Sequence, residues 1–144
     1  MTLTVPQKVR NLYLHFDKKM LNSLADIYSD DIQFRDPLHA FNGLRNLTDY
    51  YSSMMRELIE CRFEFHHSME MTARGEAILF WTMHYRHKKL AGGKPLELTG
   101  NTHLLFNDKV YYHRDYFDAG SMLYEHFPLM GFAIKRIKKK MSTT

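Results

Sequence analysis

The apolar residues of the first third of the chain recur at helical spacing, with one interruption. This spacing runs through 6–16 and again through 21–28, which predicts two short helices in a hairpin. A strand is expected at 32–36, because its apolar residues alternate and Pro37 cannot continue a ladder. A long amphipathic helix then follows over 43–58.

From Cys61 onward the period of the pattern changes to two. Turn residues divide this region into four predicted strands of an antiparallel meander, near 61–71, 75–88, 95–106 and 109–117. Residues 77–83 are apolar on both faces, so we expect the long helix to cover one side of the sheet and a second subunit the other. Helical spacing resumes after Asp118, breaks at Pro128 and continues over about 129–141. This order predicts an α+β fold with helices on one face of the sheet.

Length and composition agree with one domain over residues 1–144. Ten Met, ten Phe and nine Tyr suit an apolar pocket, although a filled core or a dimer interface would use the same residues. The single Cys61 cannot form an internal disulfide, and no apolar run has signal-peptide or membrane-spanning length. These features predict a soluble, cytoplasmic protein.

The formal charge of +4 is concentrated near the end of the chain. Five of the 20 Lys and Arg residues lie within 135–140, so the other 15 face 16 acidic residues. Nucleic-acid binding by the domain is therefore not expected. The run at 129–141 is open to two interpretations: weak contact with an anionic membrane surface, or a docking helix whose basic last turn suits the helix dipole.

Two carboxylates fall on strand faces that are otherwise apolar. Asp36 shares a face with Phe34, and Asp115 shares one with His113, because residues two apart in a strand point the same way. A carboxylate that faces an apolar interior either finds partners or has its pKa raised, and a raised pKa suits a general acid or base. Both are therefore candidates for proton transfer.

Each carboxylate also has a structural alternative. Asp36 could be a catalytic base, or it could cap the turn after it or pair with Arg35 or Arg45. Asp115 could be half of an acid/base pair across neighbouring strands, or half of a buried ion pair. Its candidate acid/base partners are His103, His113 and Tyr85, and its candidate ion-pair partners are Arg114 and Arg86.

The order of elements resembles the SnoaL-like branch of the nuclear transport factor 2-like superfamily. Residues 28–37 are similar to the segment of ketosteroid isomerases in which the Asp before Pro is the catalytic base. Residues 113–118 are similar to the last strand of limonene epoxide hydrolase, in which the Asp after Arg is a catalytic carboxylate. The resemblance implies a cone-shaped, curved antiparallel sheet that wraps around a long helix and encloses a pocket.

The sequence departs from both enzymes at their other catalytic positions. In an ungapped comparison, the oxyanion-binding Tyr of the isomerase falls at Leu12, next to Tyr13, and its protonated carboxyl falls at Thr102. The Arg and second Asp of the hydrolase fall at Met83 and Tyr85. Neither activity carries over unchanged.

We expect a cofactor-free homodimer, paired through the outer sheet face, that binds a hydrophobic small molecule in its cone. The chemistry would be that of an isomerase or cyclase, with a non-catalytic ligand-binding or dimeric interaction module as the alternative. The histidine spacing predicts no metal site, and a glycine-rich phosphate loop is missing from the sequence. The candidate catalytic residues are Asp36, Asp115 and His103. The candidate ligand-binding residues are Phe34, Tyr13, Tyr51, Met54, Trp81, Met83, Tyr85, Thr102 and His113.

Overall fold

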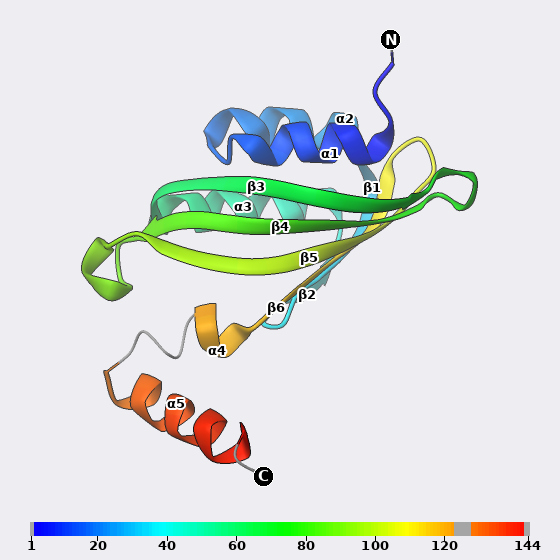
Figure 1. The fold of residues 1–144 in the computed structure, drawn as a ribbon. Helices are drawn as coiled ribbons and strands as arrows, with labels where there is room; N and C mark the ends of the chain where they lie inside the picture. Colours follow the sequence, from blue (N-terminus) through cyan, green and yellow to red (C-terminus); the bar gives the residue numbers. More distant parts are fainter. Residues whose placement is uncertain (1, 123–127, 143–144) are drawn as a thin grey trace.

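The computed structural model describes residues 2–122 and 128–142. Six strands form one curved, open sheet in the order β2-β1-β6-β5-β4-β3, and helices α1 to α3 pack on one side of it (Figure 1). The strands are β1 Tyr28–Arg35, β2 Ala40–Asn42, β3 Leu58–Met71, β4 Glu76–His87, β5 Leu96–Phe106 and β6 Val110–Phe117. The α-helices are α1 Val5–Leu14, α2 Leu24–Ile27, α3 Leu44–Glu57, α4 Ala119–Met122 and α5 Pro128–Ser142. Short 3₁₀ segments span Lys18–Ser23 (η1), Thr72–Arg74 (η2) and Ala91–Gly93 (η3).

Local sequence explains where the helices over the sheet begin. Thr4 and Gln7 form a capping box at the start of α1, with each side chain bonded to the backbone of the other, and Pro6 lies in the first turn. Gly43 precedes α3 with φ near 99°, a conformation that favours glycine. Its amide donates to the carbonyl of Ile32 at 2.7 Å, which ties the start of α3 to β1.

The predicted α+β fold and the four-stranded meander are both confirmed. Strands β3 to β6 pair antiparallel in chain order. Two features differ from the prediction of a wholly antiparallel sheet: β1 lies parallel to β6, with Phe34 opposite His113, and β2 adds a short antiparallel edge. Strand β1 also begins at Tyr28, earlier than the predicted 32–36. The parallel pairing places the early part of the chain beside its last strand.

The core lies between the helices and the concave face of the sheet. Tyr13 of α1, Tyr51 of α3 and Phe34 of β1 belong to one buried cluster. A second cluster forms around Trp81 and Met83 on the inner face of β4. The core therefore lies beside both candidate carboxylates, Asp36 just after β1 and Asp115 within β6.

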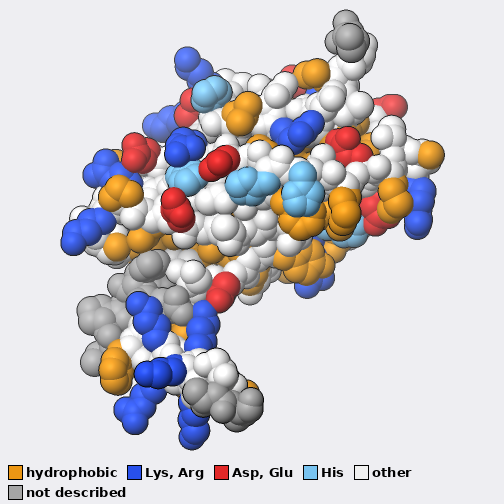
Figure 2. All heavy atoms as spheres, in the orientation of Figure 1, with side chains coloured by type: hydrophobic (Ala, Val, Ile, Leu, Met, Phe, Trp, Pro, Cys, Tyr) orange, Lys and Arg blue, Asp and Glu red, His pale blue; other side chains and the backbone are white. Residues whose placement is uncertain are grey.

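The outer face of the sheet carries histidine and hydrophobic side chains over β3 to β5 (Figure 2). Ile78 and Phe80 are only partly buried there, while Met69 and Met71 of β3 are 55% and 47% exposed. The described helices pack on the other face, so the expected cover by a second subunit stays a prediction. Among the residues described, no helix is both long and apolar enough to cross a membrane.

Gly100 permits a close approach that positions the candidate site. It lies opposite Trp81 on β4 and Phe117 on β6. A Cβ atom at this position would lie 2.6 Å from the Trp81 ring and 2.6 Å from the carbonyl oxygen of Tyr116. The indole can therefore lie against β5 only because residue 100 has no side chain.

Helix α5 extends away from the sheet at the end of the chain (Figure 1). Lys138 donates to Asp118 at 2.6 Å, and Ile134 lies close to Gly120, so α5 is fastened beside α4. The helix predicted directly after Asp118 is described as far as Met122, and the rest of that prediction, 123–127, lies outside the described residues.

Candidate functional site

A cavity of about 50 Å³ lies between α1, α3 and the sheet, and both candidate carboxylates line it. Its volume is enough for a few water molecules. Six of the nine predicted ligand-binding residues lie in its wall: Tyr13, Phe34, Tyr51, Met54, Trp81 and Met83. A neighbouring space of about 20 Å³ is lined by Thr102 and His113, and it shares Tyr13, Trp81 and Asp115 with the first. The two spaces therefore meet at Asp115.

Asp115 is held from two sides through one carboxylate oxygen. The Thr102 hydroxyl donates to Oδ1 at 2.5 Å, and Nε2 of His113 lies 2.8 Å from the same oxygen. Trp81 donates its indole N–H to the Thr102 hydroxyl at 2.9 Å, which orients that group. No hydrogen bond from the described residues reaches Oδ2, and the Asp115 side chain is 19% exposed. One oxygen is thus fixed while the other is available to a ligand.

A chain of buried hydroxyls continues from His113 toward the helices. Nδ1 of His113 lies 2.9 Å from the Tyr28 hydroxyl, which lies 2.9 Å from the Tyr13 hydroxyl. The Tyr13 hydroxyl is in turn hydrogen-bonded to that of Tyr51, in the cavity wall. Strand β1, helix α1 and helix α3 each contribute one tyrosine. The chain links Asp115 to the opposite wall of the cavity.

The proton positions along this chain are coupled, because each hydroxyl has one proton to donate. When His113 is neutral and donates Nε2–H to Asp115, its Nδ1 must accept from Tyr28. Tyr28 then accepts from Tyr13, and Tyr13 accepts from Tyr51. When His113 carries two ring protons, it donates to both neighbours and the order reverses, so that the Tyr51 proton is free to point into the cavity.

Burial keeps these phenols neutral. It raises the pKa of Tyr13, Tyr28 and Tyr51 well above the usual value of 10.0, and the nearby charge of Asp115 raises it further. The pKa of Tyr50 is raised as well, first by burial and then by the Asp36 carboxylate beside it. Neutral phenols can both donate and accept, which is what a reversible chain requires.

Asp36 holds the turn that follows β1. Its Oδ1 accepts the backbone N–H groups of Leu38 and His39, both at 2.7 Å, and the His39 ring lies 3.1 Å away. Its Oδ2 accepts the Tyr50 hydroxyl at 3.0 Å. The side chain is only 2% exposed, so little of the carboxylate surface reaches the cavity. These contacts match the turn-capping alternative for Asp36.

The arginines considered as ion-pair partners contact other groups. Arg35 donates to the carbonyls of Phe34 and Phe41, and no ion pair joins Asp36 to Arg35 or Arg45 within the described structure. Arg114 lies over the Tyr116 ring at 4.7 Å, and Arg86 donates to the Gly93 carbonyl at 2.7 Å. The described lining of the cavity contains neither Lys nor Arg. Asp115 is therefore held by hydrogen bonds from neutral groups and by His113.

Two of the predicted site residues lie away from the cavity. His103 is on the outer face of β5, where its Nε2 is 2.7 Å from Glu76 and its ring packs against Tyr112. It faces away from Asp115 because Thr102, one residue earlier, takes the inward position. Tyr85 is buried on the inner face of β4 and is not among the residues that line the cavity; its hydroxyl donates to the carbonyl of Met122, a lining residue, at 3.3 Å.

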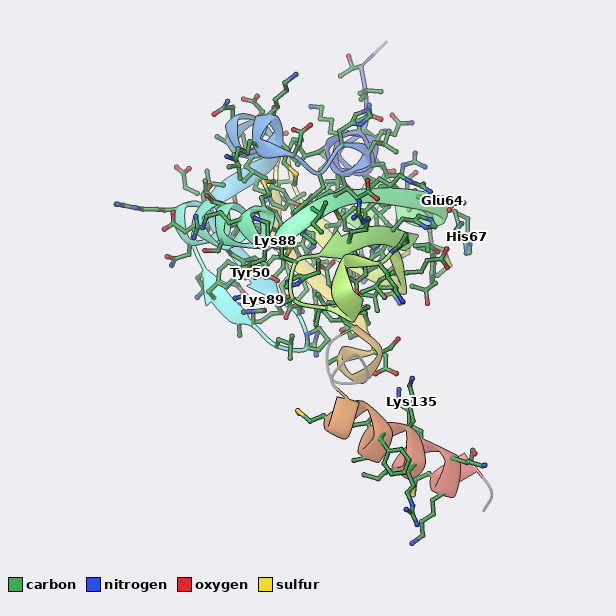
Figure 3. All side chains as sticks on the ribbon, turned by 90° about the vertical axis from the view of Figure 1, so that its left-hand side faces the viewer. Tyr50, Glu64, His67, Lys88, Lys89 and Lys135 are labelled. Carbon is green, nitrogen blue, oxygen red and sulfur yellow. The ribbon has the colours of Figure 1, made fainter. Side chains whose placement is uncertain are left out.

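Sequence reasoning did not single out Tyr28 and Tyr50. Tyr28 was assigned to the end of a helix, although it has the same parity as Ile32 and Phe34 and could have been placed on the inner face of a longer strand. Tyr50 lies at the end of the site near β1 and β2, where it packs against Phe34 (Figure 3). Its helical spacing from Leu47 and Met54 was the available signal. Among the described side chains, no group of three comes together that could hold a metal ion.

Comparison with known proteins agrees with this fold. The SnoaL-like domain family matches residues 9–113. A search of the curated proteins found no significant match. An NTF2-like protein of unknown function from Burkholderia pseudomallei has a similar structure, with a TM-score of 0.72 and 16% identity, over 85% of this chain and 96% of that one.

Two candidate polyketide cyclases of known structure are also similar. The SnoaL-like protein from Shewanella putrefaciens has a TM-score of 0.68 and 17% identity over 84% of this chain and 95% of its own. The protein from Pseudomonas putida has a TM-score of 0.70 and 15% identity over 85% and 97%. At these identities the likeness shows a shared fold.

Proposed function

The chain belongs to the SnoaL-like domain family, and on this premise we propose that it binds a hydrophobic, carbonyl-containing small molecule and moves a proton with Asp115. One observation carries the proposal: Asp115 has one oxygen fixed by Thr102 and His113 and the other without a partner among the described residues, at the wall of an aromatic cavity. The names of the two candidate polyketide cyclases support the same reaction class.

The first step is removal of a proton from a carbon next to the ligand carbonyl. The C–H bond breaks, the proton forms an O–H bond with Oδ2 of Asp115, and the electron pair moves to the carbonyl oxygen as an enolate. In an isomerase reaction, the proton then returns to a different carbon. In a cyclase reaction, the enolate carbon attacks a second carbonyl of the same molecule, and the proton neutralises the new alkoxide.

His113 and the chain of tyrosines assist this step through hydrogen bonds. His113 is a positioning residue that orients Asp115 through Oδ1. When His113 carries both ring protons before the reaction, the hydroxyl chain is already reversed, so the Tyr51 hydroxyl can donate to the enolate oxygen while Oδ2 of Asp115 takes the C–H proton. Base and oxyanion donor would then lie at the two ends of one chain. Asp36 shapes the cavity wall through its turn.

A non-catalytic ligand-binding module is the second candidate. It is favoured by the hydrogen bond from the Tyr50 hydroxyl to Asp36, because two polar groups of the site are then already paired with each other and not with a substrate. We also propose that the protein forms a homodimer through the outer sheet face, where Met69 and Met71 are exposed beside Ile78. An exposed apolar patch on a sheet is a typical protein contact.

Exchange of ketone α-protons in D₂O, followed by NMR, tests the enzyme proposal without knowledge of the natural substrate. Acetone and butanone serve as probes, because the cavity has room for only a few water molecules, and quenching of Trp81 fluorescence reports their binding. We expect the wild-type protein to accelerate exchange and Asp115→Asn to slow it at least about a hundredfold with binding retained. Asp36→Asn is the matched control and should keep most of the rate.

Two results would count against the assignment. Exchange by Asp115→Asn at the wild-type rate, with binding intact and an unchanged unfolding midpoint, would remove Asp115 from the chemistry. Binding of the probes by the wild-type protein without any exchange would favour the ligand-binding module instead.

A further inference from the structure

Helix α5 carries an apolar stripe along one side. Five apolar residues recur at intervals of three and four, so they share one face of the helix: Met130, Ala133, Ile134, Ile137 and Met141. We call this set the α5 stripe. Ile134 lies near Gly120, where the helix meets the body. Met130 and Ile137, however, are 49% and 61% exposed.

The remaining faces of α5 are strongly basic. Lys135, Arg136 and three lysines at 138–140 lie within its 15 residues, and the helix contains no acidic residue. On the face of the molecule seen in Figure 2, Lys and Arg side chains gather on this helix, below the body. The exposed Phe132 is the exception, because it lies outside the stripe and on the basic side. The helix therefore combines a narrow apolar face with a high positive charge.

The position of α5 leaves it accessible to a large flat surface. It stands apart from the sheet in both ribbon views, and Lys135 lies far from Glu64 and His67 on β3 (Figures 1 and 3). On the outer sheet face Glu64 is paired with His84 and Glu76 with His103. Asp118, next to β6, forms an ion pair with Lys138 of α5.

A second copy of α5 is a poor match for this surface. A symmetric contact places the same patch of both copies together, so the cations of the two helices would repel. An anionic lipid surface matches both features at once, because its headgroups attract the cations while its acyl boundary accepts the stripe. Charge complementarity therefore favours an anionic lipid surface over a second copy of α5 as the binding partner.

We infer that α5 binds peripherally to anionic lipid membranes and lies in the plane of the interface, with the exposed residues of the α5 stripe, among them Met130 and Ile137, directed into the bilayer. Neither feature is sufficient alone, because the stripe is short and surface charge is screened by salt. Binding is therefore reversible and depends on both. Helix α5 contributes no residue to the described lining of the cavity, so membrane binding is independent of the cavity chemistry.

Co-sedimentation of the full-length protein with vesicles tests it. Phosphatidylcholine vesicles are compared with vesicles of phosphatidylcholine and phosphatidylserine. The wild-type protein should partition onto the anionic vesicles only, and less as salt is raised. A triple variant, Lys135→Gln with Arg136→Gln and Lys139→Gln, should lower the partition coefficient roughly a hundredfold, at about fivefold per cation.

Two further variants separate charge from the stripe. Ile137→Gln keeps every cation and should also reduce binding. The matched control replaces three exposed cations elsewhere, Lys18→Gln with Lys19→Gln and Arg74→Gln, and should bind as the wild type does.

Three outcomes would overturn the inference. Equal binding to both kinds of vesicle would remove the role of charge. Equal loss in the control would show that net charge acts without α5. Absence of vesicle binding would exclude the membrane, and a mass in light scattering that falls from dimer to monomer with Ile137→Gln would then identify a second copy as the occupant.

Discussion

Removing the hydroxyl of Tyr28 tests the buried hydrogen-bond chain without any ligand. The side chain is fully buried, and its oxygen lies 2.9 Å from both the Tyr13 hydroxyl and Nδ1 of His113. Phe at this position keeps the ring and its packing. Tyr28→Phe therefore deletes two hydrogen bonds from the middle of the chain and leaves a cavity no larger than one oxygen atom.

The expected loss follows from the two groups left behind. Each hydrogen bond contributes about 1 kcal/mol net, and a buried polar group left unpaired costs about 1–3 kcal/mol. Rearrangement of Tyr13 toward Tyr51 satisfies one of the two groups, since that contact is already present. The Nδ1 atom of His113 then has no donor. We expect Tyr28→Phe to lower the free energy of unfolding by about 2–4 kcal/mol.

Urea unfolding followed by circular dichroism measures this change. The double variant Tyr13→Phe with Tyr28→Phe should lose less than the sum of the two single variants, because both belong to one network. Tyr116→Phe is the matched control, since Tyr116 is 43% exposed, and it should change stability by less than about 0.5 kcal/mol. A loss below that limit for Tyr28→Phe, or full additivity in the double variant, would refute the coupled chain.

Three other properties follow from the same structure. Gly100→Ala should lower the free energy of unfolding by about 1–3 kcal/mol, because the new Cβ atom would lie 2.6 Å from the Trp81 ring. Since Trp81 is the only tryptophan, its fluorescence emission should shift as well, and unchanged emission would contradict the packing. The free energy of unfolding should fall as pH rises above about 10. In the unfolded chain the tyrosines release their protons there, whereas burial raises the pKa of Tyr13, Tyr28 and Tyr51 and keeps them protonated in the folded protein. A urea unfolding midpoint that stays constant up to pH 11 would contradict this. Burial raises the pKa of Cys61 to about 12, so iodoacetamide at pH 8 should modify it roughly a thousandfold more slowly than in urea; equal rates would show an accessible thiolate.

The fold was largely readable from the sequence because its signals are local. Apolar residues recur with a period of 3.6 in the helices and of two in the four long strands, which distinguishes the two kinds of element. Pro6 and Asn42-Gly43 mark where helices begin. The parallel pairing of β1 with β6 was not predicted, because a register between distant segments leaves no periodic trace in either one. Strand β2 was also missed, since a three-residue edge is too short to show alternation.

The structure agrees with the predicted faces of the site residues where strand parity decides, and it differs where contacts between elements decide. Asp115 and His113 were placed on one otherwise apolar face by their spacing of two, and they are hydrogen-bonded to each other beside the cavity. Trp81 and Met83, predicted as ligand-binding residues, line that cavity. Parity also puts His103 on the outer face once Thr102 is known to point inward. The sequence alone does not show which of these two residues points inward. The turn that occupies Asp36 depends on backbone geometry after Pro37, which composition alone does not fix.

The parallel pairing of β1 with β6 also constrains when this protein can fold during synthesis. Tyr28 and its partner His113 are 85 residues apart. Until the ribosome has released β6, the tyrosines of α1, β1 and α3 have no imidazole to complete their chain, and the sheet lacks the strand that joins its two halves. Such long-range closure is slow compared with helix formation. The nascent chain must therefore remain open, with its aromatic core exposed, for most of its translation, and the site becomes complete only as the last strand docks.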